Sequence, residues 1–198
     1  MKQIHITRDS SGTVAFEPVS IDATETVFFT NMDPQSAHWP TIASNQLGPA
    51  PSPNSSQCNV PPPPAGSTSS VFTYKCKIDG HTAEQGTINV FVPLAAQNTT
   101  LKGATVGKPI EPQSLTVGGT KTYVISDQVF QVTDATKKVI QSGPGVGPGL
   151  QLNSTDSGVT VSGTPSLAGT YAFTFTVNDG MGRNLQQVQY TMAVAPAS

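Results

Sequence analysis

Three residues with metal-binding side chains stand at spacings that could form one site: His38, Cys76 and His81. The chain holds only three histidines and two cysteines, so few other combinations of imidazole and thiolate are available. Cys76 ends a strand-like run, Asp79-Gly80 predicts a tight turn after it, and His81 follows that turn. Two imidazoles and one thiolate are the ligands of mononuclear copper sites that transfer electrons. The spacing therefore predicts a copper site built from two loops.

Short strands joined by turns are the elements expected to position these side chains. Only 11% of the residues are charged, and the chain is rich in glycine and proline, which end strands and form turns. Between residues 39 and 66 the sequence reads as a long polar loop that contains the proline run 61–64. In the first half, strand-like runs lie near residues 2–7, 13–16, 19–22, 25–31, 69–76 and 86–92.

A second series of strand-like runs fills the other half of the chain. From Tyr171 to Val177, large apolar side chains alternate with small polar ones, a period of two that predicts one buried face. Residues 94–109 lose clear alternation and are expected to form a linker or boundary. The sequence thus predicts an all-β chain of two antiparallel β-sandwiches, over residues 1–93 and 110–198.

Two blocks of the first domain carry a family resemblance. The first block comprises Phe16-Glu17-Pro18, then 27–33 (VFFTNMD), then His38; the second comprises Tyr74-Lys75-Cys76, His81 and 86–90 (GTINV). With these blocks, residues 1–92 resemble the cupredoxin family of plastocyanin-like and azurin-like blue-copper domains. The resemblance implies a Greek-key sandwich that holds one mononuclear type 1 copper ion on His38, Cys76 and His81. It also implies single-electron transfer to a redox partner protein whose identity the sequence does not give.

The fourth ligand departs from the family pattern. Cupredoxins usually add a weak axial methionine a few residues after the second histidine, whereas the four methionines here are residues 1, 32, 181 and 192. Gln85 stands nearest the expected place, with Glu84 beside it. The resemblance therefore implies Gln85 as the axial ligand. An amide oxygen in place of a thioether is expected to lower the reduction potential.

Residues 110–195 resemble an Ig-like module of bacterial surface and secreted proteins, within the wider cadherin-like group. The resemblance rests on residues 147–182, with the pieces Ser162-Gly163-Thr164-Pro165 and Ala168-Gly169-Thr170-Tyr171. It implies a spacer, a cell-surface attachment or a self-assembly module. The aspartates of this half lack the acidic spacing of a calcium loop, so no metal site is expected there.

The two cysteines allow a second interpretation, in which Cys58 and Cys76 form a disulfide. Such a bridge could stabilise the fold by about 3 kcal/mol in the chain-entropy model. His38 and His81 would then be ordinary turn residues of a metal-free, structural, adhesive or self-assembling extracellular protein. The position of Cys76 between a strand end and a histidine favours copper. With copper on Cys76, however, Cys58 would be a lone thiol, which counts against the copper interpretation if the protein lies in an oxidising compartment.

Composition and motifs exclude several other functions. The net charge of −2 and the lack of a basic run exclude a nucleic-acid partner, and no apolar run is long enough to span a membrane. The first residues are expected to form a strand and not a signal peptide, since no apolar run follows Met1-Lys2. The low charge and the many serines and threonines favour a secreted, periplasmic or cell-surface bacterial protein. No catalytic motif is present, so no enzyme is expected.

His5 alternates with Ile4 and Ile6 and is expected to face solvent, without a metal role.

Overall fold

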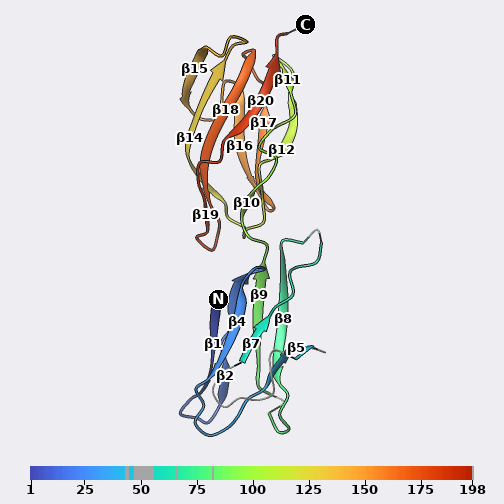
Figure 1. Ribbon diagram of the computed structural model, residues 1–198, viewed down its shortest axis with the longest axis vertical. Helices are drawn as coiled ribbons and strands as arrows, with labels where there is room; N and C mark the ends of the chain where they lie inside the picture. Colours follow the sequence, from blue (N-terminus) through green and yellow to red (C-terminus); the bar gives the residue numbers. More distant parts are fainter. Residues whose placement is uncertain (43–44, 47–55, 66, 82, 198) are drawn as a thin grey trace. The chain divides into compact units, whose positions relative to one another are not determined.

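The structure is a computed structural model that describes residues 1–42, 45–46, 56–65, 67–81 and 83–197, with the backbone alone at 41–42, 45–46 and 56–59. These residues form 20 β-strands and no helix (Figure 1). The chain divides into two compact units, Met1–Pro93 and Leu94–Ser198. The all-β fold expected from the sequence is confirmed.

The first unit is a sandwich of two sheets around one core. Its sheets have the strand orders β2-β1-β4-β7 and β3-β9-β8-β5-β6. Strands β1 and β4 pair in parallel, as do β3 and β9, and the other pairs are antiparallel. The strands are β1 (Lys2–Arg8), β2 (Val14–Phe16), β3 (Val19–Asp22), β4 (Thr26–Asn31), β5 (Pro40–Ile42), β6 (Asn45–Gln46), β7 (Ser56–Asn59), β8 (Ser69–Cys76) and β9 (Gln85–Phe91).

Alternation along the strands decides which side chains enter this core. In β8, Tyr74 and Cys76 point inward, while Val71 on the other face is 66% exposed. The Tyr74 ring stacks on Phe16 at a centroid distance of 5.5 Å and meets the edge of Phe29 at 5.1 Å. These aromatic contacts tie the two sheets together. Because β8 ends on an inward position, the Cys76 sulfur enters the end of the core.

The stretch expected to be one long loop contains three short strands. Strand β5 pairs with the end of β8, so that Pro40 lies opposite Cys76, and β7 pairs with β4. Val60, directly after β7, is 5% exposed and belongs to the core. Strands of two to four residues are too short to show an alternating pattern, which is why the sequence did not reveal them.

The second unit is also a β-sandwich, with its own core. Its larger sheet has the order β11-β20-β18-β14-β15 with β19 paired to β18; a second sheet has the order β12-β17-β16, and β10 pairs with β13. The strands are β10 (Ala95–Ala96), β11 (Ala104–Thr105), β12 (Ile110–Ser114), β13 (Thr116–Val117), β14 (Val124–Thr133), β15 (Val139–Pro144), β16 (Leu150–Thr155), β17 (Gly158–Gly163), β18 (Gly169–Asn178), β19 (Asn184–Leu185) and β20 (Tyr190–Ala195).

Residues 94–109, expected to be a linker, instead form part of the second unit. Strand β10 pairs with β13, β11 pairs in parallel with β20, and Leu101 is 6% exposed in the core. As with the short strands of the first unit, two-residue strands carry too little alternation to be recognised. The expected alternation in β18 is confirmed, since Tyr171, Phe173 and Phe175 are all buried.

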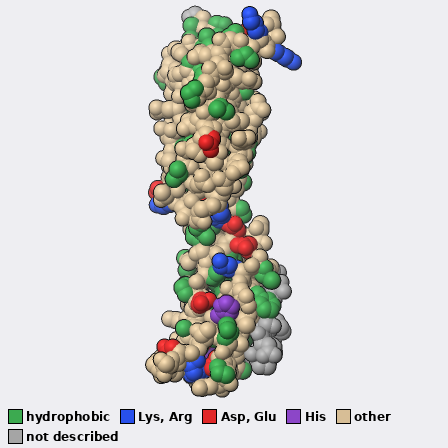
Figure 2. Space-filling model, turned by 90° about the vertical axis from the view of Figure 1, so that its left-hand side faces the viewer, with side chains coloured by type: hydrophobic (Ala, Val, Ile, Leu, Met, Phe, Trp, Pro, Cys, Tyr) green, Lys and Arg blue, Asp and Glu red, His purple; other side chains and the backbone are tan. Residues whose placement is uncertain are grey.

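The surface agrees with the low charge of the sequence. On the face seen in Figure 2, charged side chains are few and scattered among uncharged ones. The His5 side chain is 38% exposed while Ile4 and Ile6 are buried, which confirms its expected orientation. None of the described residues belongs to a helix with the length and hydropathy of a membrane span.

Candidate metal centre

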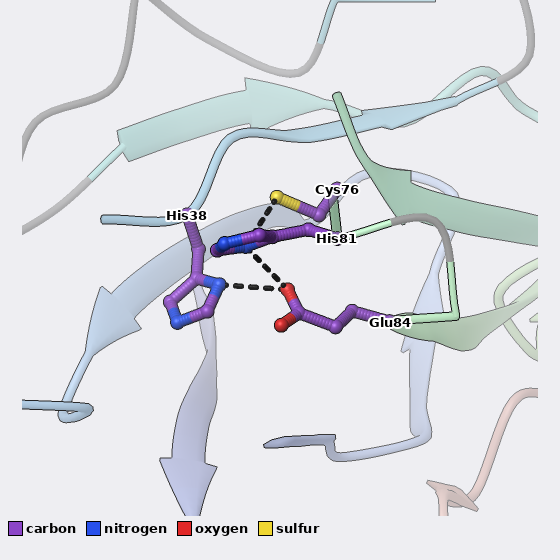
Figure 3. Close-up of side chains that lie close together, drawn as sticks. All are labelled: His38, Cys76, His81 and Glu84. Atoms are coloured by element: carbon purple, nitrogen blue, oxygen red, sulfur yellow. Dashed lines mark hydrogen bonds and ion pairs between the residues drawn. The ribbon is translucent and has the colours of Figure 1, made fainter. Parts of the chain in front are cut away.

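Four side chains converge at one end of the first unit: His38, Cys76, His81 and Glu84 (Figure 3). Each offers one ligand atom, and these atoms all lie within 4.8 Å of one another. His38 comes from the connection between β4 and β5, Cys76 ends β8, and the other two lie in the turn between β8 and β9. The structure thus brings together the three residues singled out in the sequence and adds a carboxylate.

Backbone hydrogen bonds shape the turn between β8 and β9. The Cys76 N–H donates to the Glu84 carbonyl at 3.0 Å and closes the hairpin. Inside it, the His81 N–H donates to the Ile78 carbonyl at 3.1 Å, and the Glu84 N–H donates to the His81 carbonyl at 3.0 Å. Gly80 supplies the positive φ of 88° that this tight path requires. Two successive turns therefore return both side chains toward the cysteine.

The separations between the ligand atoms are close to those that one metal ion requires. Glu84 Oε2 lies 2.8 Å from His38 Nδ1 and 3.0 Å from His81 Nδ1. Cys76 Sγ lies 3.7 Å from His81 Nδ1. Ligands at about 2.0 to 2.3 Å from a tetrahedral ion are separated from one another by about 3.3 to 3.8 Å. Small side-chain adjustments would therefore allow all four atoms to share an ion.

The hydrogen-bonding capacity of His38 also favours a cation in the cluster. Its Nε2 lies 2.9 Å from Asp33 Oδ2, and its Nδ1 lies 2.8 Å from Glu84 Oε2. A neutral imidazole carries a single N–H and can donate to only one of these carboxylates, whereas a protonated imidazole can donate to both. A metal ion on Nδ1 would satisfy the second ring nitrogen and the Glu84 carboxylate together. The residues present therefore fit a bound metal.

The cluster is largely shielded from water. His38 is 3% exposed and Cys76 is 6% exposed. Burial raises the pKa of the Cys76 thiol, and the Trp39 N–H, which donates to Sγ at 3.3 Å, opposes that rise. A metal ligand must be the thiolate, so an ion bound at Sγ would displace the proton. His81 has the most exposed side chain of the four, at 21%.

A second layer of polar contacts lies behind His38. Asp33, whose side chain is fully buried, is bound by the Arg8 guanidinium through Nε–Oδ1 at 3.0 Å and Nη2–Oδ2 at 2.7 Å. Hydrogen bonding from Arg8 holds the pKa of the Asp33 carboxyl well below its usual range, so Asp33 is a carboxylate. Sequence reasoning missed this network, because nothing in local spacing relates residues 25 positions apart.

The structure places Gln85, the expected axial ligand, away from the cluster. Gln85 is exposed and lies opposite Lys75 in the ladder, on the face that Cys76 does not use. Glu84 has the same parity as the buried Ile88, and so it points inward. That parity was the signal in the sequence that could have identified Glu84 in place of its neighbour.

Cys76 is a free thiol in this structure. Cys58 lies in β7, where its backbone pairs with Val27 of the sheet opposite β8, and its side chain lies outside the described residues. The described part of the chain therefore gives no support to the disulfide interpretation.

Trp39 connects the cluster to the surface of the unit. It is half-buried, its backbone N–H donates to the Cys76 sulfur, and Lys77 Nζ lies 4.7 Å from the centre of its ring. Part of the Trp39 ring is therefore packed inside the unit, and part contributes to the surface beside the site.

Comparisons with known proteins identify no family. No family model matches the chain, and no curated protein matches it. Among solved structures, the chain is similar to CopC from Methylosinus trichosporium OB3b, with 18% identity and a TM-score of 0.29, over 54% of this chain and 93% of CopC. It is similar to SporoSAG from Toxoplasma gondii, with 15% identity and a TM-score of 0.39, over 90% of this chain and 97% of that one. It is also similar to the fibronectin(III)-like modules of Clostridium thermocellum CbhA, with 11% identity and a TM-score of 0.29, over 91% and 90% of the two chains. TM-scores this low carry no functional weight, so function is argued from the geometry of the site.

Proposed function

We propose that the first unit binds one copper ion through His38, Cys76, His81 and Glu84, and that it is a cupredoxin-type electron-transfer domain. The observation that carries this proposal is the convergence of the four ligand atoms within 4.8 Å at a largely buried position. Copper bound there would supply one-electron transfer between its two common oxidation states. Glu84 replaces Gln85 in the proposed ligand set.

The charges around the site favour a divalent ion. Arg8 and Asp33 form an ion pair and cancel each other. The Glu84 carboxylate and the Cys76 thiolate together carry two negative charges, which match those of a divalent cation. Uncompensated charge is costly where water is excluded, and this matched donor set avoids that cost. One-electron reduction would leave one negative charge in excess, so the site is expected to hold the oxidised ion and to have a low reduction potential.

The protein scaffold limits rearrangement of the ligands. Cys76 is fixed by the ladder of β8 with β5 and β9, and its sulfur accepts the Trp39 N–H. His38 is held between Asp33 and the edge of the Phe16 ring, whose centroid lies 5.9 Å from that of the imidazole. Ligands fixed in this way suit electron transfer, because the coordination changes little between oxidation states.

The partly exposed His81 ring is the proposed route for electrons to a redox partner protein. Trp39 and Lys77 would form the surface beside it. The second unit would act as a spacer, an attachment or a self-assembly module. Export from the cytoplasm is part of the same proposal, supported by the low charge and the serine- and threonine-rich composition.

Copper titration followed by protein-film voltammetry tests this proposal. We expect one Cu(II) per chain and a reversible one-electron wave, unchanged in a Cys58→Ser control. Absence of copper binding, or binding without a reversible wave, would contradict electron transfer; tight zinc binding alone would point to a structural metal site. A thiol count on denatured, unreduced and metal-free protein should give two thiols, whereas a count of zero would support the Cys58–Cys76 disulfide.

A further inference from the structure

We infer that Asp33 is a positioning residue of the proposed copper centre, which holds the proton of His38 on Nε2 and so presents the Nδ1 lone pair to the metal. This inference rests on the proposed function and extends it to a residue outside the ligand set. Asp33 has no part in the cysteine-and-histidine pattern that points to copper.

Asp33 is bound on every side by groups that fix its orientation. Its Oδ1 accepts hydrogen bonds from Arg8 Nε at 3.0 Å and from the Gln35 N–H at 2.9 Å. Its Oδ2 accepts from Arg8 Nη2 and Ser36 Oγ, both at 2.7 Å, and lies 2.9 Å from His38 Nε2. A carboxylate fixed by donors on both oxygens cannot turn away from the imidazole. His38 therefore faces a constant acceptor on Nε2.

The Asp33 carboxylate decides which nitrogen of His38 is free for a ligand. An ionised carboxylate only accepts hydrogen bonds, so the ring nitrogen beside it carries the hydrogen. In the neutral ring, the other nitrogen, Nδ1, then has its lone pair free. Nδ1 faces Glu84 Oε2 at 2.8 Å, but that oxygen also lies 3.0 Å from His81 Nδ1 and can accept a hydrogen from there, whereas Asp33 is held on both oxygens by other donors. A carboxylate that receives the second N–H of a ligating histidine fixes both the tautomer and the ring orientation.

Arg8 allows this carboxylate to be used without adding net charge to the site. The guanidinium contacts both oxygens of Asp33, while its own side chain remains 21% exposed. Asp33 can therefore strengthen His38 as a donor while the two anionic ligands, Glu84 and the Cys76 thiolate, still balance a divalent ion. Arg8 and Asp33 together form the support for the first histidine ligand.

The Asp33→Asn variant tests this role, and Asp179→Asn provides a matched control. Asp179 is a second fully buried aspartate paired with an arginine, since Arg183 Nη2 lies 2.7 Å from its Oδ2 with 19% of the arginine side chain exposed. It lies in the second unit, where the backbone N–H groups of Thr120, Met181 and Arg183 and the Arg183 side chain donate to it. An asparagine amide presents both a donor and an acceptor, so Asp33→Asn removes the fixed acceptor while preserving size.

The first measurement uses the unmodified, metal-free chain. Nitrogen-15 NMR, recorded at a pH where the spectrum itself shows a neutral His38 ring, reports which ring nitrogen carries the hydrogen. We expect the Nε2–H tautomer of His38 in the wild type and a mixture of tautomers in Asp33→Asn. A wild-type His38 that carries its hydrogen on Nδ1 would overturn the inference, even if the variant failed to fold.

The second measurement is copper affinity. Asp33→Asn is expected to weaken binding by about 10- to 100-fold, as for other carboxylates behind ligating histidines, and Asp179→Asn is expected to leave it unchanged. Equal affinity in Asp33→Asn and the wild type would overturn the inference. If the wild type itself binds no copper, the proposed function fails, whereas the tautomer measurement still decides whether Asp33 controls His38.

Discussion

Glu84 is expected to lower the reduction potential of the proposed copper centre. Its Oε2 lies within 3.0 Å of the Nδ1 atoms of both His38 and His81, and its side chain is only 14% exposed. A carboxylate at this position stabilises the more highly charged oxidation state of a bound metal through its negative charge. The axial position of a copper site is the one that tunes its potential. A substitution of Glu84 should therefore change the reduction potential more than a substitution of Gln85.

Replacement of Glu84 by glutamine tests this difference at the residue scale. Because the change removes one buried charge beside the metal, we expect the reduction potential to rise by on the order of 100 mV, about 2 kcal/mol for one electron. Gln85→Met is the matched control at the exposed neighbouring position and should leave the potential unchanged. Protein-film voltammetry measures both. A rise in Gln85→Met with none in Glu84→Gln would restore Gln85 as the ligand.

The hairpin of β8 and β9 is the element that positions most of the site. Gly86, which follows the metal-binding turn, lies against the Tyr74 ring, and a Cβ atom there would approach that ring to 2.5 Å and the Phe16 Cβ to 2.9 Å. These contacts leave no room for a side chain. The close approach of β9 to the aromatic core therefore fixes where Glu84 and His81 emerge.

Gly86→Ala is expected to disturb this element. Overpacking against Tyr74 should destabilise the first unit by about 1–3 kcal/mol and weaken copper binding through the displaced turn. Gly103→Ala is the control, because a Cβ there meets only the Ala193 carbonyl at an ordinary 3.4 Å. Urea denaturation followed by tryptophan fluorescence measures the effect on the first unit, and circular dichroism measures that of Gly103→Ala on the second unit. An unchanged urea midpoint in Gly86→Ala would show that β9 can move away from the Tyr74 ring without loss of stability.

The hairpin of β14 and β15 gives a pH dependence that is independent of the metal site. Asp134 Oδ1 accepts hydrogen bonds from Thr136 Oγ1 at 2.6 Å, from the Thr136 N–H at 2.8 Å and from the Lys138 N–H at 3.0 Å. These bonds, the Thr136 hydroxyl first, lower the pKa of the Asp134 carboxyl. A carboxyl whose pKa is lowered by folding stabilises the fold above its unfolded pKa of about 3.9, and this contribution is lost as the pH falls.

Asp134→Asn should therefore remove part of the acid sensitivity of the second unit. At neutral pH the variant should be less stable than the wild type, and the difference should shrink as the pH falls below about 4. Urea midpoints of the second unit, followed by circular dichroism across this range, provide the measurement. A difference that stays constant with pH would show that the Asp134 charge contributes nothing to the turn.

Strand patterns show how far the sequence predicts the fold and the site. The long strands were predictable because Val27 and Phe29 in β4, like Tyr171 and Phe173 in β18, repeat with a period of two. The short strands β5, β7, β10 and β11 were not, because they pair with strands that lie far away in the chain, and the two-residue β6 is too short to show a pattern.

The same distinction applies to the site. His38, Cys76 and His81 could be grouped from the sequence, because rare ligand types stand beside strand ends and a turn. The family pattern drew attention to Gln85, whereas strand parity indicates Glu84. Asp33 could not be found, since its role depends on hydrogen bonds to a residue of another strand.

At the scale of the whole molecule, the two units have separate cores. The buried core residues of the first unit lie between Ile4 and Val90, and those of the second lie between Leu101 and Val194. Because each unit has its own cluster of buried apolar residues, we expect each to unfold as its own cooperative structure. The only tryptophan of the chain, Trp39, lies in the first unit beside the proposed metal centre, so its fluorescence reports on that unit alone.

Copper should therefore stabilise one unfolding transition and leave the other unchanged. At a free copper concentration about 100 times the dissociation constant, the first unit should gain about 2.7 kcal/mol, because the ion binds only its folded state. Tryptophan fluorescence follows this transition. Leu115→Ala, in the core of the second unit, should lower the free energy of unfolding of that unit by about 2–5 kcal/mol. The change should appear in circular dichroism and leave the transition followed by tryptophan fluorescence unchanged. Equal stabilisation of both transitions by copper would contradict separate units.

The absorption spectrum of the copper-loaded chain tests the central claim most directly. If copper is bonded to the Cys76 sulfur, the wild type must show an intense visible thiolate-to-copper charge-transfer band, and Cys76→Ser must lack it. Cys58→Ser should retain the band at full intensity. Absence of the band in the wild type, or an identical band in Cys76→Ser, would contradict the proposed site.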